Sequence, residues 1–339
     1  MTRALICHQA GPGLTVQDMG RTGLLAQGLS RGGAADRLAL SEGAALLGQS
    51  DTLAAVEMAG MGGVFEATED IAVALTGAPM RAEIDGAPVL WNAAHLLPGG
   101  AKLKIGAATA GTYGYLSVAG GIDTPLVLGA RSAHLTAGLG AALGQGDRLP
   151  VGPARTRRSG VRLAVTPRFD GGEIRVLRSL QTDFFPPETL ERFENTVFSR
   201  DQRGNRMGVR MNSDGDGFHV EGGLHVISEI IVPGDIQMTG DGAPYVLLAE
   251  CQTTGGYPRI GTVIPSDLPR VAQAGPGATL RFRFVGLDEA LALNLRHLAE
   301  IEALKSRVEP LVRDPASIHN LLEYQLISGV SSGADPEED

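Results

Sequence analysis

The sequence predicts a mainly β protein with a few short helices and a C-terminal helical extension. Short apolar segments recur between glycine, proline and aspartate residues, a pattern typical of strands separated by turns. The chain has 339 residues, of which 47 are glycine and 4% are aromatic, and this composition favours many turns between short strands. These observations alone indicate an all-β sandwich or barrel.

Several segments have the length and residue types of strands, and one of them alternates strictly. In the stretch 279–285, Leu280, Phe282 and Phe284 fall on one face. Arg281 and Arg283 fall on the opposite face, as in a strand with one buried side. The expected strands, in chain order, are 71–75, 102–105, 113–118, 173–177, 224–232, 245–249 and 279–285. Turns between such closely spaced strands predict a mostly antiparallel arrangement.

Helical spacing is confined to a few stretches. One helix is expected over 34–47, and a short one over 188–195 follows two prolines. Asp288 is expected to cap a further helix. The apolar side of that helix carries Leu291, Leu295 and Leu298. Such a side predicts either a strap packed on the β structure or an element that docks a partner.

Composition and charge argue against several classes of function. The formal net charge is -9, which repels nucleic-acid phosphates, so no nucleic-acid partner is expected. No apolar run approaches the ~18 residues of a membrane span, so no membrane association is expected. Cys7 and Cys251 lie far apart with no CxxC pair, which favours a cytoplasmic protein without a disulfide framework or a zinc site. Cys251 is expected to be a small buried residue rather than a nucleophile.

The most informative stretch follows the apolar run 245–249. It consists of Gln252, Thr253, Thr254, Gly255, Gly256 and Tyr257. A strand that ends in small polar residues and glycines exposes backbone N–H groups beside short side chains, which suits the binding of a carboxylate, an amide or a phosphate. The alternative is a tight turn in which glycine only supplies a positive φ.

Two other polar patterns are better explained without a metal. The stretch 212–217 is rich in aspartate and glycine, but the twelfth position of an EF-hand loop would be Gly223 instead of glutamate. His219, Glu221 and His225 would share one face of a strand, yet no fourth ligand accompanies them. No metal site is expected from either pattern.

Separate blocks along most of the chain resemble the carboxyltransferase-domain family. The matching blocks are 15–23, 28–36, 71–78, 115–122, 234–237, 247–258 and 266–273. They occur in the family's order over about residues 13–285, and several blocks together are more specific than any one motif. The family includes the C subunit of prokaryotic 5-oxoprolinase, the second subunit of allophanate hydrolase, an antagonist of a histidine-kinase inhibitor, and part of urea carboxylase.

The resemblance implies two cyclophilin-like β-barrels, one in each half. A chain of this length suits about two domains, and the arginine-rich stretch 155–160 is the best linker candidate. The expected organisation is one barrel over 1–158, a second over 159–286, and a helix with an acidic tail over 287–339. The tail is expected to be disordered over 331–339.

The resemblance also implies a function as one subunit of an ATP-dependent 5-oxoprolinase complex that opens 5-oxoproline to glutamate. The implied partners are the inhibitor-like B subunit of 5-oxoprolinase and its hydrolase A subunit, in a hetero-oligomer, with ATP and Mg²⁺ as cofactors and a small amide as substrate. No GxxxxGK[ST] sequence occurs, so a nucleotide site here would not be a P-loop. Two alternatives stay open. One is carboxyl transfer to urea or a similar amide, with biotin carried by another protein, and the other is a non-catalytic antagonist that binds a histidine-kinase inhibitor.

Within the matching blocks, Glu250, Gln252 and Asp18 are the expected catalytic residues. The Glu250 carboxylate beside a cyclic amide suits a general base. Arg21 suits a substrate carboxylate, with an ion pair to Asp18 as the alternative. Asp36 is expected either to cap the first helix or to orient a ligand, and capping is favoured.

Thr76 and Gly77 complete the expected substrate site together with residues 253–257. They end a strand as the later glycine pair does, so two similar loops would face one cleft. Positions that depart from the family pattern include Gly32, which replaces a serine, and Ala44 and Gln49, which replace asparagines. These changes alter hydrogen-bonding groups and bear on which substrate is bound.

Overall fold

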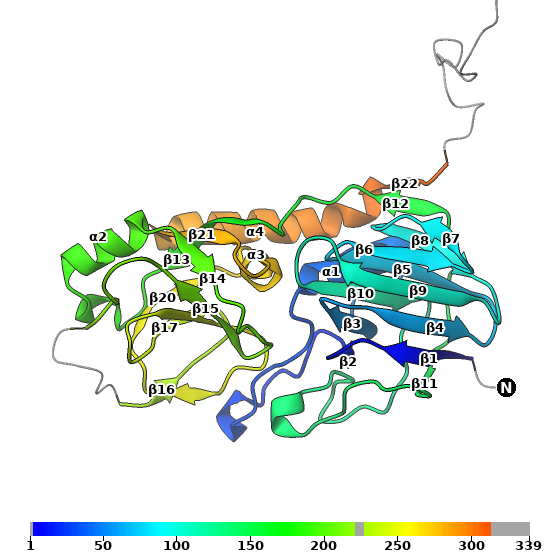
Figure 1. The fold of residues 1–339 in the computed structure, drawn as a ribbon, viewed down its shortest axis with the longest axis horizontal. Coiled ribbons are helices and arrows are strands. Elements are labelled where there is room, and N and C mark those ends of the chain that lie inside the picture. The colour runs from blue at the N-terminus through cyan, green and yellow to red at the C-terminus, as the bar shows by residue number, and fades with distance from the viewer. Residues whose placement is uncertain (1–2, 221–226, 313–339) are drawn as a thin grey trace, which may run out of the picture.

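Two β-rich bodies lie side by side and are joined along one side by a long helix (Figure 1). This computed structural model describes residues 3–220 and 227–312. The expected disordered tail at 331–339 and part of the expected strand 224–232 lie outside the described residues. The predicted mainly β fold with few helices is confirmed.

The first body, called here the first domain, consists of two sheets in which every strand pair is antiparallel. One sheet has the spatial order β11 (Arg148–Pro150), β1 (Ala4–Ala10), β4 (Gly63–Ala67), β9 (Lys102–Ala108), β6 (Met80–Ile84) and β7 (Ala87–Val89). The other has the order β2 (Thr15–Gln17), β3 (Ala55–Ala59), β10 (Tyr113–Val118), β5 (Ile71–Gly77), β8 (Ala93–Leu97), β12 (Val161–Leu163) and β22 (Val308–Pro310).

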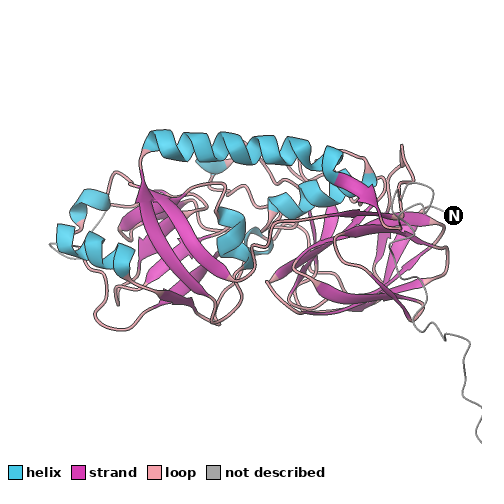
Figure 2. Ribbon diagram, turned by 90° about the horizontal axis from the view of Figure 1, so that it is seen from above, coloured by secondary structure: helices cyan, strands magenta, loops and turns pink. Residues whose placement is uncertain are grey.

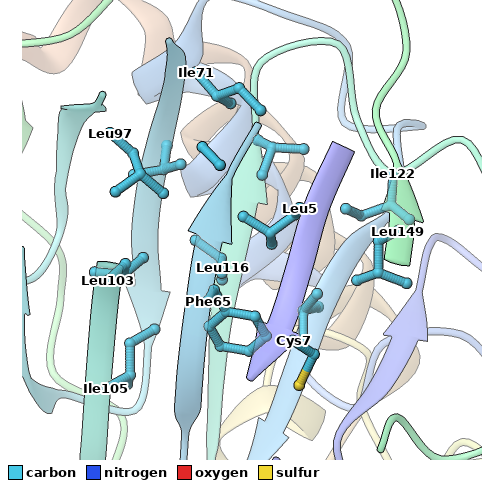
Figure 3. Close-up of a cluster of buried hydrophobic side chains, with 14 of the residues drawn as sticks. Leu5, Cys7, Phe65, Ile71, Leu97, Leu103, Ile105, Leu116, Ile122 and Leu149 are labelled. Carbon is cyan, nitrogen blue, oxygen red and sulfur yellow. The ribbon is translucent and has the colours of Figure 1, made fainter. Parts of the chain in front are cut away.

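The core of the first domain lies between these two sheets (Figure 3). Strand β1 alternates in burial, and its Leu5 and Cys7 are fully buried. Phe65 of β4 lies beside them, while Ile71 of β5 and Leu116 of β10 come from the other sheet. The removal of these side chains from water is the main favourable term that holds the two sheets together.

The second body, called here the barrel, is a closed seven-stranded structure. Its order is β13 (Gly171–Leu177), β20 (Arg259–Val263), β17 (Asp235–Met238), β18 (Pro244–Leu247), β15 (Gly208–Asn212), β14 (Phe198–Arg200) and β21 (Thr279–Val285). Strands β13 and β21 pair in parallel, and the other pairs are antiparallel. A separate two-stranded sheet joins β16 (Glu229–Ile230) to β19 (Thr254–Gly255).

Phenylalanine side chains fill much of the barrel's core. Phe193 projects from α2 (Pro187–Asn195) and stacks on Phe282, with ring centroids 5.1 Å apart. The ring centroids of Phe198 and Phe218 lie 5.3 and 5.6 Å from that of Phe193. The alternation expected in 279–285 holds for its first half, since Leu280 and Phe282 are buried and Arg281 is exposed, whereas Arg283 and Phe284 are both half-buried.

The three expected helices lie close to their predicted positions. Helix α1 (Arg37–Leu47) is capped at its start by Asp36 and ends at Gly48 in the left-handed conformation. The cap expected at Asp288 is wrong, because α4 (Leu287–Ala303) has Gly286 at its N-cap and Asp288 within its first turn. The other short helices are α3 (Leu268–Gln273), η1 (Leu25–Gln27), η2 (Leu135–Ala137), η3 (Thr182–Phe184) and η4 (Leu304–Arg307).

Helix α4 runs along both bodies and returns the chain from the barrel to the first domain (Figure 2). It packs on the barrel through Ala290, and Leu304 of η4 enters the apolar cluster beneath α1. Strand β22 then pairs with β12 in the first domain's sheet. The leucines expected to pack, Leu291, Leu295 and Leu298, are 52%, 66% and 48% exposed. The strap is therefore held by the opposite side of the helix.

The chain crosses between the two bodies later than the linker candidate at 155–160. Strand β12 (Val161–Leu163) still pairs with β8 of the first domain. The crossing segment is 164–170, between β12 and β13, and it contains the buried Arg168. The expected boundary at 158 thus falls before the last strand that this segment adds to the first domain.

Candidate functional site

The loop expected to carry chemistry leaves β18 beside the domain junction. Its Thr254–Gly255 forms β19, and Thr253 O accepts a hydrogen bond from Ile231 N at 3.1 Å. The side chains of Gln252, Thr253 and Thr254 make no hydrogen bond to any part of the chain that the structure describes. Their polar groups are therefore available to a ligand, as the sequence predicted.

Gly255 lies against a buried side-chain donor, the Gln237 amide. A Cβ atom at Gly255 would lie 2.4 Å from Gln237 Nε2, so any larger residue would displace that side chain. The Nε2 of Gln237 is buried and has no hydrogen-bond partner among the described residues. A buried donor without a partner is costly, which makes Gln237 a group that a ligand oxygen or a water could satisfy.

Glu250, at the start of the loop, is buried in an ion pair and is not a free base. Its Oε1 accepts from Arg206 Nε at 2.6 Å, and its Oε2 accepts from Thr136 Oγ1 at 3.2 Å. Only 3% of Glu250 is exposed. The neighbouring Cys251 is also buried, and burial raises its thiol pKa to about 12, which confirms its expected inert character.

Arg206 joins the barrel to the first domain. Besides Glu250, its guanidinium contacts Glu57 of β3 through Nη1 and donates to Gly33 O from Nη2 at 2.5 Å. Glu57 also accepts from the Tyr115 hydroxyl at 2.6 Å. Burial lowers the pKa of Arg206, but the two carboxylates more than offset that effect and the net pKa is raised. We call Arg206, Glu57 and Glu250 the Arg206 cluster.

A Ser–His–Glu arrangement adjoins this cluster. Ser30 Oγ and His134 Nε2 are 2.8 Å apart, and His134 Nδ1 lies 3.9 Å from Glu250 Oε2. However, Nδ1 accepts the backbone N–H of Ala137 at 3.3 Å, so the neutral ring carries its proton on Nε2 and donates to Ser30. Burial lowers the pKa of His134, with Glu250 opposing the shift. In this tautomer the imidazole cannot take the Ser30 proton, so the three residues do not form an activated nucleophile.

Asp18 and Arg21 hold two loops of the first domain together. Asp18 accepts from Gly20 N at 2.8 Å and from Arg131 N at 2.6 Å, and it also contacts the Ser132 hydroxyl. Arg21 donates to the Ser132 carbonyl at 2.6 Å from Nη2. The alternative of an Asp18–Arg21 ion pair is wrong, because the Arg21 guanidinium donates to backbone carbonyls. Its Nη1 is buried without a partner in the described chain.

Asp36 caps α1 and links it to the barrel. Its Oδ1 accepts from Ala39 N at 3.2 Å, which confirms the favoured capping role. Its Oδ2 accepts from Arg168 Nε and from Gln273 Nε2, each at 2.8 Å. Arg168 in turn donates both terminal nitrogens to Glu42 at 2.8 Å. Burial lowers the pKa of Arg168, but Asp36 and Glu42 raise it by more, so the guanidinium stays charged.

Thr76 and Gly77 do not face a cleft with the later loop, contrary to expectation. Strand β5 continues through Gly77, and α1 covers the side of the strand that Thr76 faces. Thr76 is fully buried and donates its hydroxyl hydrogen to Ala39 O at 2.8 Å. The Gly77 carbonyl accepts from Trp91 Nε1 at 3.1 Å. Both residues are therefore occupied by the first domain's own structure.

Two of the positions that depart from the family pattern, Gly32 and Gln49, have structural explanations. Gly32 has φ +60, and a Cβ there would lie 3.1 Å from the His134 ring. Gln49 Oε1 accepts from Gly120 N at 3.0 Å, and Gln49 Nε2 donates to Val118 O at 3.1 Å. Ala44 is buried within α1. Gly32 thus leaves room for His134, while Gln49 supplies its own hydrogen bonds.

Two cavities flank the domain junction, away from residues 252–257, which we call the QTTGGY loop. One of about 280 Å³ lies beneath α4, and one of about 480 Å³ lies beside the segments 108–111 and 275–279. Across residues 3–220 and 227–312, no group of three or more His, Cys, Asp or Glu side chains is placed to hold a metal ion. Glu221 and His225 lie outside that range. Within it, no helix is both long and apolar enough to cross a membrane.

Sequence reasoning missed four residues that the fold brings to the loop: Ser30, Glu57, His134 and Arg206. Ser30 lies inside the matching block 28–36, so it could have been included. Arg206 stands between Gly204 and Gly208 in an arginine-rich stretch, where nothing separates it from the exposed Arg203. Only the fold shows that the half-buried Arg206 lies between two carboxylates.

Comparison with known families places the chain. The carboxyltransferase domain, subdomain A and B, matches residues 27–284. The chain belongs to this family. The matched span includes the Arg206 cluster and the QTTGGY loop, and it confirms the resemblance seen in the sequence.

Relatives of known name agree with this assignment. The 5-oxoprolinase C subunit of Haemophilus influenzae is 33% identical over 87% of this chain and 96% of its own length. That of Escherichia coli is 34% identical over 84% of this chain and 92% of its own length. The crystal structure of the Kluyveromyces lactis urea carboxylase shares the fold, with a TM-score of 0.79 and 23% identity over 92% of this chain and 31% of that one.

Proposed function

We propose that this chain is one subunit of an ATP-dependent 5-oxoprolinase that opens 5-oxoproline to glutamate. The observation that carries the proposal is the nearly full-length alignment with two proteins named as the C subunit of 5-oxoprolinase. Two relatives named urea amidolyase align over only 15% and 16% of their own lengths. Carboxyltransferase-family membership together with this length match favours the role of a subunit that acts with partners.

The QTTGGY loop is the proposed contact with the lactam. The free Gln252 amide and the hydroxyls of Thr253 and Thr254 can donate to the lactam oxygen, which gains negative charge when water attacks the carbonyl carbon. Attack forms the new C–O bond, the ring C–N bond breaks, and the nitrogen leaves with a proton. Gln237 Nε2, buried behind Gly255 without a partner in the described chain, is a further donor within this wall.

Glu250 has a positioning role in this proposal. Because its carboxylate is paired with Arg206 at 2.6 Å, it orients the start of the loop relative to the first domain. Asp18, Arg21 and Asp36 likewise support the surrounding loops through their hydrogen bonds to backbone and side-chain groups. The loop residues after Cys251 keep free side-chain polar groups that can bind the substrate.

The loop does not fit ATP with Mg²⁺. A triphosphate needs several cationic donors, and Mg²⁺ prefers carboxylate ligands that are free to bind it. Glu250 is held in its ion pair with Arg206, and the loop itself contains no lysine or arginine. We therefore assign ATP and Mg²⁺ to the two partners, the inhibitor-like B subunit and the hydrolase A subunit, in a cytoplasmic hetero-oligomer.

The decisive test is ATP hydrolysis by the chain co-expressed with both partners, with and without 5-oxoproline. We expect 5-oxoproline to stimulate hydrolysis, and we expect Gln252→Ala to remove the stimulation without changing the melting temperature, because Gln252 is exposed. Gln202→Ala is the matched control, since Gln202 is also exposed and lies elsewhere on the barrel. A folded complex that 5-oxoproline does not stimulate would contradict the proposal.

A relative named urea amidolyase, 27% identical over 73% of this chain, makes carboxyl transfer the second candidate. In that reaction biotin would be carried by another protein, and the loop would hold urea or a similar amide. Carboxylation of urea in the presence of a carboxybiotin carrier, lost in Gln252→Ala, would support it. If both activities are absent and the wild type and Gln252→Ala both bind the inhibitor-like partner tightly, the result would point to the non-catalytic antagonist.

A further inference from the structure

The cavity of about 280 Å³ beneath α4 has walls from three parts of the molecule. Arg168 comes from the crossing segment, Arg270 and Ser266 from the barrel, and Arg296 from α4. Arg307 of η4, which packs on the first domain, completes one side. Figure 2 shows α4 lying over the junction of the two bodies. A ligand in this cavity would therefore touch both bodies and the strap.

The walls carry more positive than negative charge, although the whole chain has a net charge of -9. Five arginines and three carboxylates line the cavity. Glu42 forms an ion pair with Arg168, and Asp267 forms one with Arg175. The third carboxylate, Glu300, is exposed on α4. The arginines that remain unmatched by a buried carboxylate are Arg270, Arg296 and Arg307.

These three guanidinium groups keep free N–H donors. Arg270 donates only Nη1, to Gly171 O at 2.9 Å, and Arg307 donates only Nη2, to Ala164 O at 2.9 Å. Arg296 has neither an ion pair nor a hydrogen bond within residues 3–220 and 227–312. Each guanidinium has five N–H donors, so most of the donors in these walls are unused by the protein.

A buried hydroxyl adds a second, independent indication. Ser266 lines the same wall, and its Oγ is buried without a hydrogen-bond partner in the described chain. Buried polar atoms are nearly always paired, so an orphan in a cavity wall indicates a group that is missing. His297, on the α4 side, has its pKa lowered chiefly by burial, so it adds a neutral donor or acceptor.

We propose that this cavity binds a small anion that carries two negative charges, such as inorganic phosphate or a short dicarboxylate, through Arg270, Arg296 and Arg307 with Ser266. Guanidinium groups suit both ligands because they donate in pairs to the oxygens of phosphate and carboxylate. The ligand would connect the barrel, α4 and η4, so occupancy would stabilise the two bodies in this arrangement. This site is separate from the QTTGGY loop and does not rest on the proposed activity.

Isothermal titration calorimetry on the full chain tests the proposal, with inorganic phosphate and glutarate as probes and acetate at equal ionic strength as the single-charge control. We expect the wild type to bind phosphate or glutarate more tightly than acetate. Arg296→Gln and Arg307→Gln should each weaken that binding about tenfold or more, since each removes charge-assisted hydrogen bonds. Both residues are exposed, so circular dichroism melting should show normally folded variants.

Arg281→Gln is the matched control, because Arg281 is an exposed arginine on β21 that does not line the cavity. Its binding should equal that of the wild type. Tighter binding of phosphate would identify phosphate as the ligand class, and tighter binding of glutarate would identify a dicarboxylate; either result supports the site. Absence of binding to both anions, or equal weakening by Arg281→Gln and Arg296→Gln, would overturn the proposal.

Discussion

Arg206 Nε donates to Glu250 Oε1 across 2.6 Å, and the same guanidinium contacts Glu57 in the other body. This one side chain therefore forms ion pairs with two buried carboxylates from opposite sides of the junction. Its replacement in Arg206→Met would leave both carboxylates without their charge partner. We expect the free energy of unfolding to fall by about 3–5 kcal/mol, as when one member of a buried pair is removed, measured by urea denaturation at pH 7.5.

Arg203→Met is the control for that measurement. Arg203 pairs with Asp201 at 2.9 Å, but its side chain is 78% exposed. A surface ion pair contributes at most about 1 kcal/mol, so this variant should unfold close to the wild type. Equal losses in Arg203→Met and Arg206→Met would show that the Arg206 cluster does not stabilise the junction.

The glycines of the first matching block provide a second prediction. Gly20 and Gly23 both have φ +81, but their surroundings differ. A Cβ at Gly20 would lie 2.6 Å from Arg31 O, while nothing lies within 4 Å of one at Gly23. Gly20→Ala should lower the free energy of unfolding by at least about 1 kcal/mol more than Gly23→Ala, because a backbone clash adds to the same left-handed strain.

Thermal and urea unfolding of both variants would measure this difference. Gly23→Ala isolates the conformational cost, about 1–2 kcal/mol for an alanine held in the left-handed region. If the two variants were equally stable, the loop that contains Arg31 would have to move freely away from Gly20. That result would contradict the tight approach of these two loops.

Most strands could be predicted from the sequence because each has a local signal. Segment 279–285 has the residue alternation of a strand, and segment 113–118 has the apolar residues and flanking turns of one; they correspond to β21 and β10. The capping role of Asp36 was also visible, since a short acidic side chain preceded a helical pattern. Expected strand 224–232 is reduced to β16 (Glu229–Ile230) in its described part, because that segment lies outside the closed barrel and pairs only with β19.

The site was only partly predictable, because it depends on contacts between distant segments. The loop at 252–257 was recognisable from its composition. The burial of Glu250, however, follows from Arg206 and Thr136, which lie 44 and 114 residues away in the chain. The role of Thr76 could not be predicted from the sequence either, because no local pattern shows that α1 covers the end of β5 where Thr76 lies.

The pH dependence of stability follows from buried histidines. His95 is 9% exposed and its Nε2 donates to Leu90 O at 2.8 Å, and burial lowers its pKa. The unfolded chain, with an ordinary histidine pKa of about 6.5, then binds a proton at higher pH than the folded chain. His95 therefore contributes stability above its unfolded pKa of about 6.5. This contribution is lost as the pH falls below about 6.5, and the free energy of unfolding then decreases by up to about 1.4 kcal/mol per pH unit.

We therefore expect His95→Gln to lose less stability than the wild type between pH 7 and pH 5, measured by urea midpoints at both pH values. His134 acts in the same direction and is present in both proteins, so it does not affect the comparison. His219→Gln is the control, because it removes an exposed imidazole. A pH dependence in His95→Gln as steep as that in His219→Gln would show that His95 does not need to stay neutral.

The strap made by α4 and η4 gives the last prediction. Leu304 is 5% exposed and packs with Leu46 and Leu47 of α1, whereas Leu295 is 66% exposed on the outer side of α4. Leu304→Ala should lower the free energy of unfolding by about 2–5 kcal/mol, because it opens a cavity in a packed cluster. Leu295→Ala should change it by less than about 0.5 kcal/mol. Urea unfolding of both variants measures the contrast, and a cost at Leu295 as large as that at Leu304 would mean that the outer side of α4 is covered in solution.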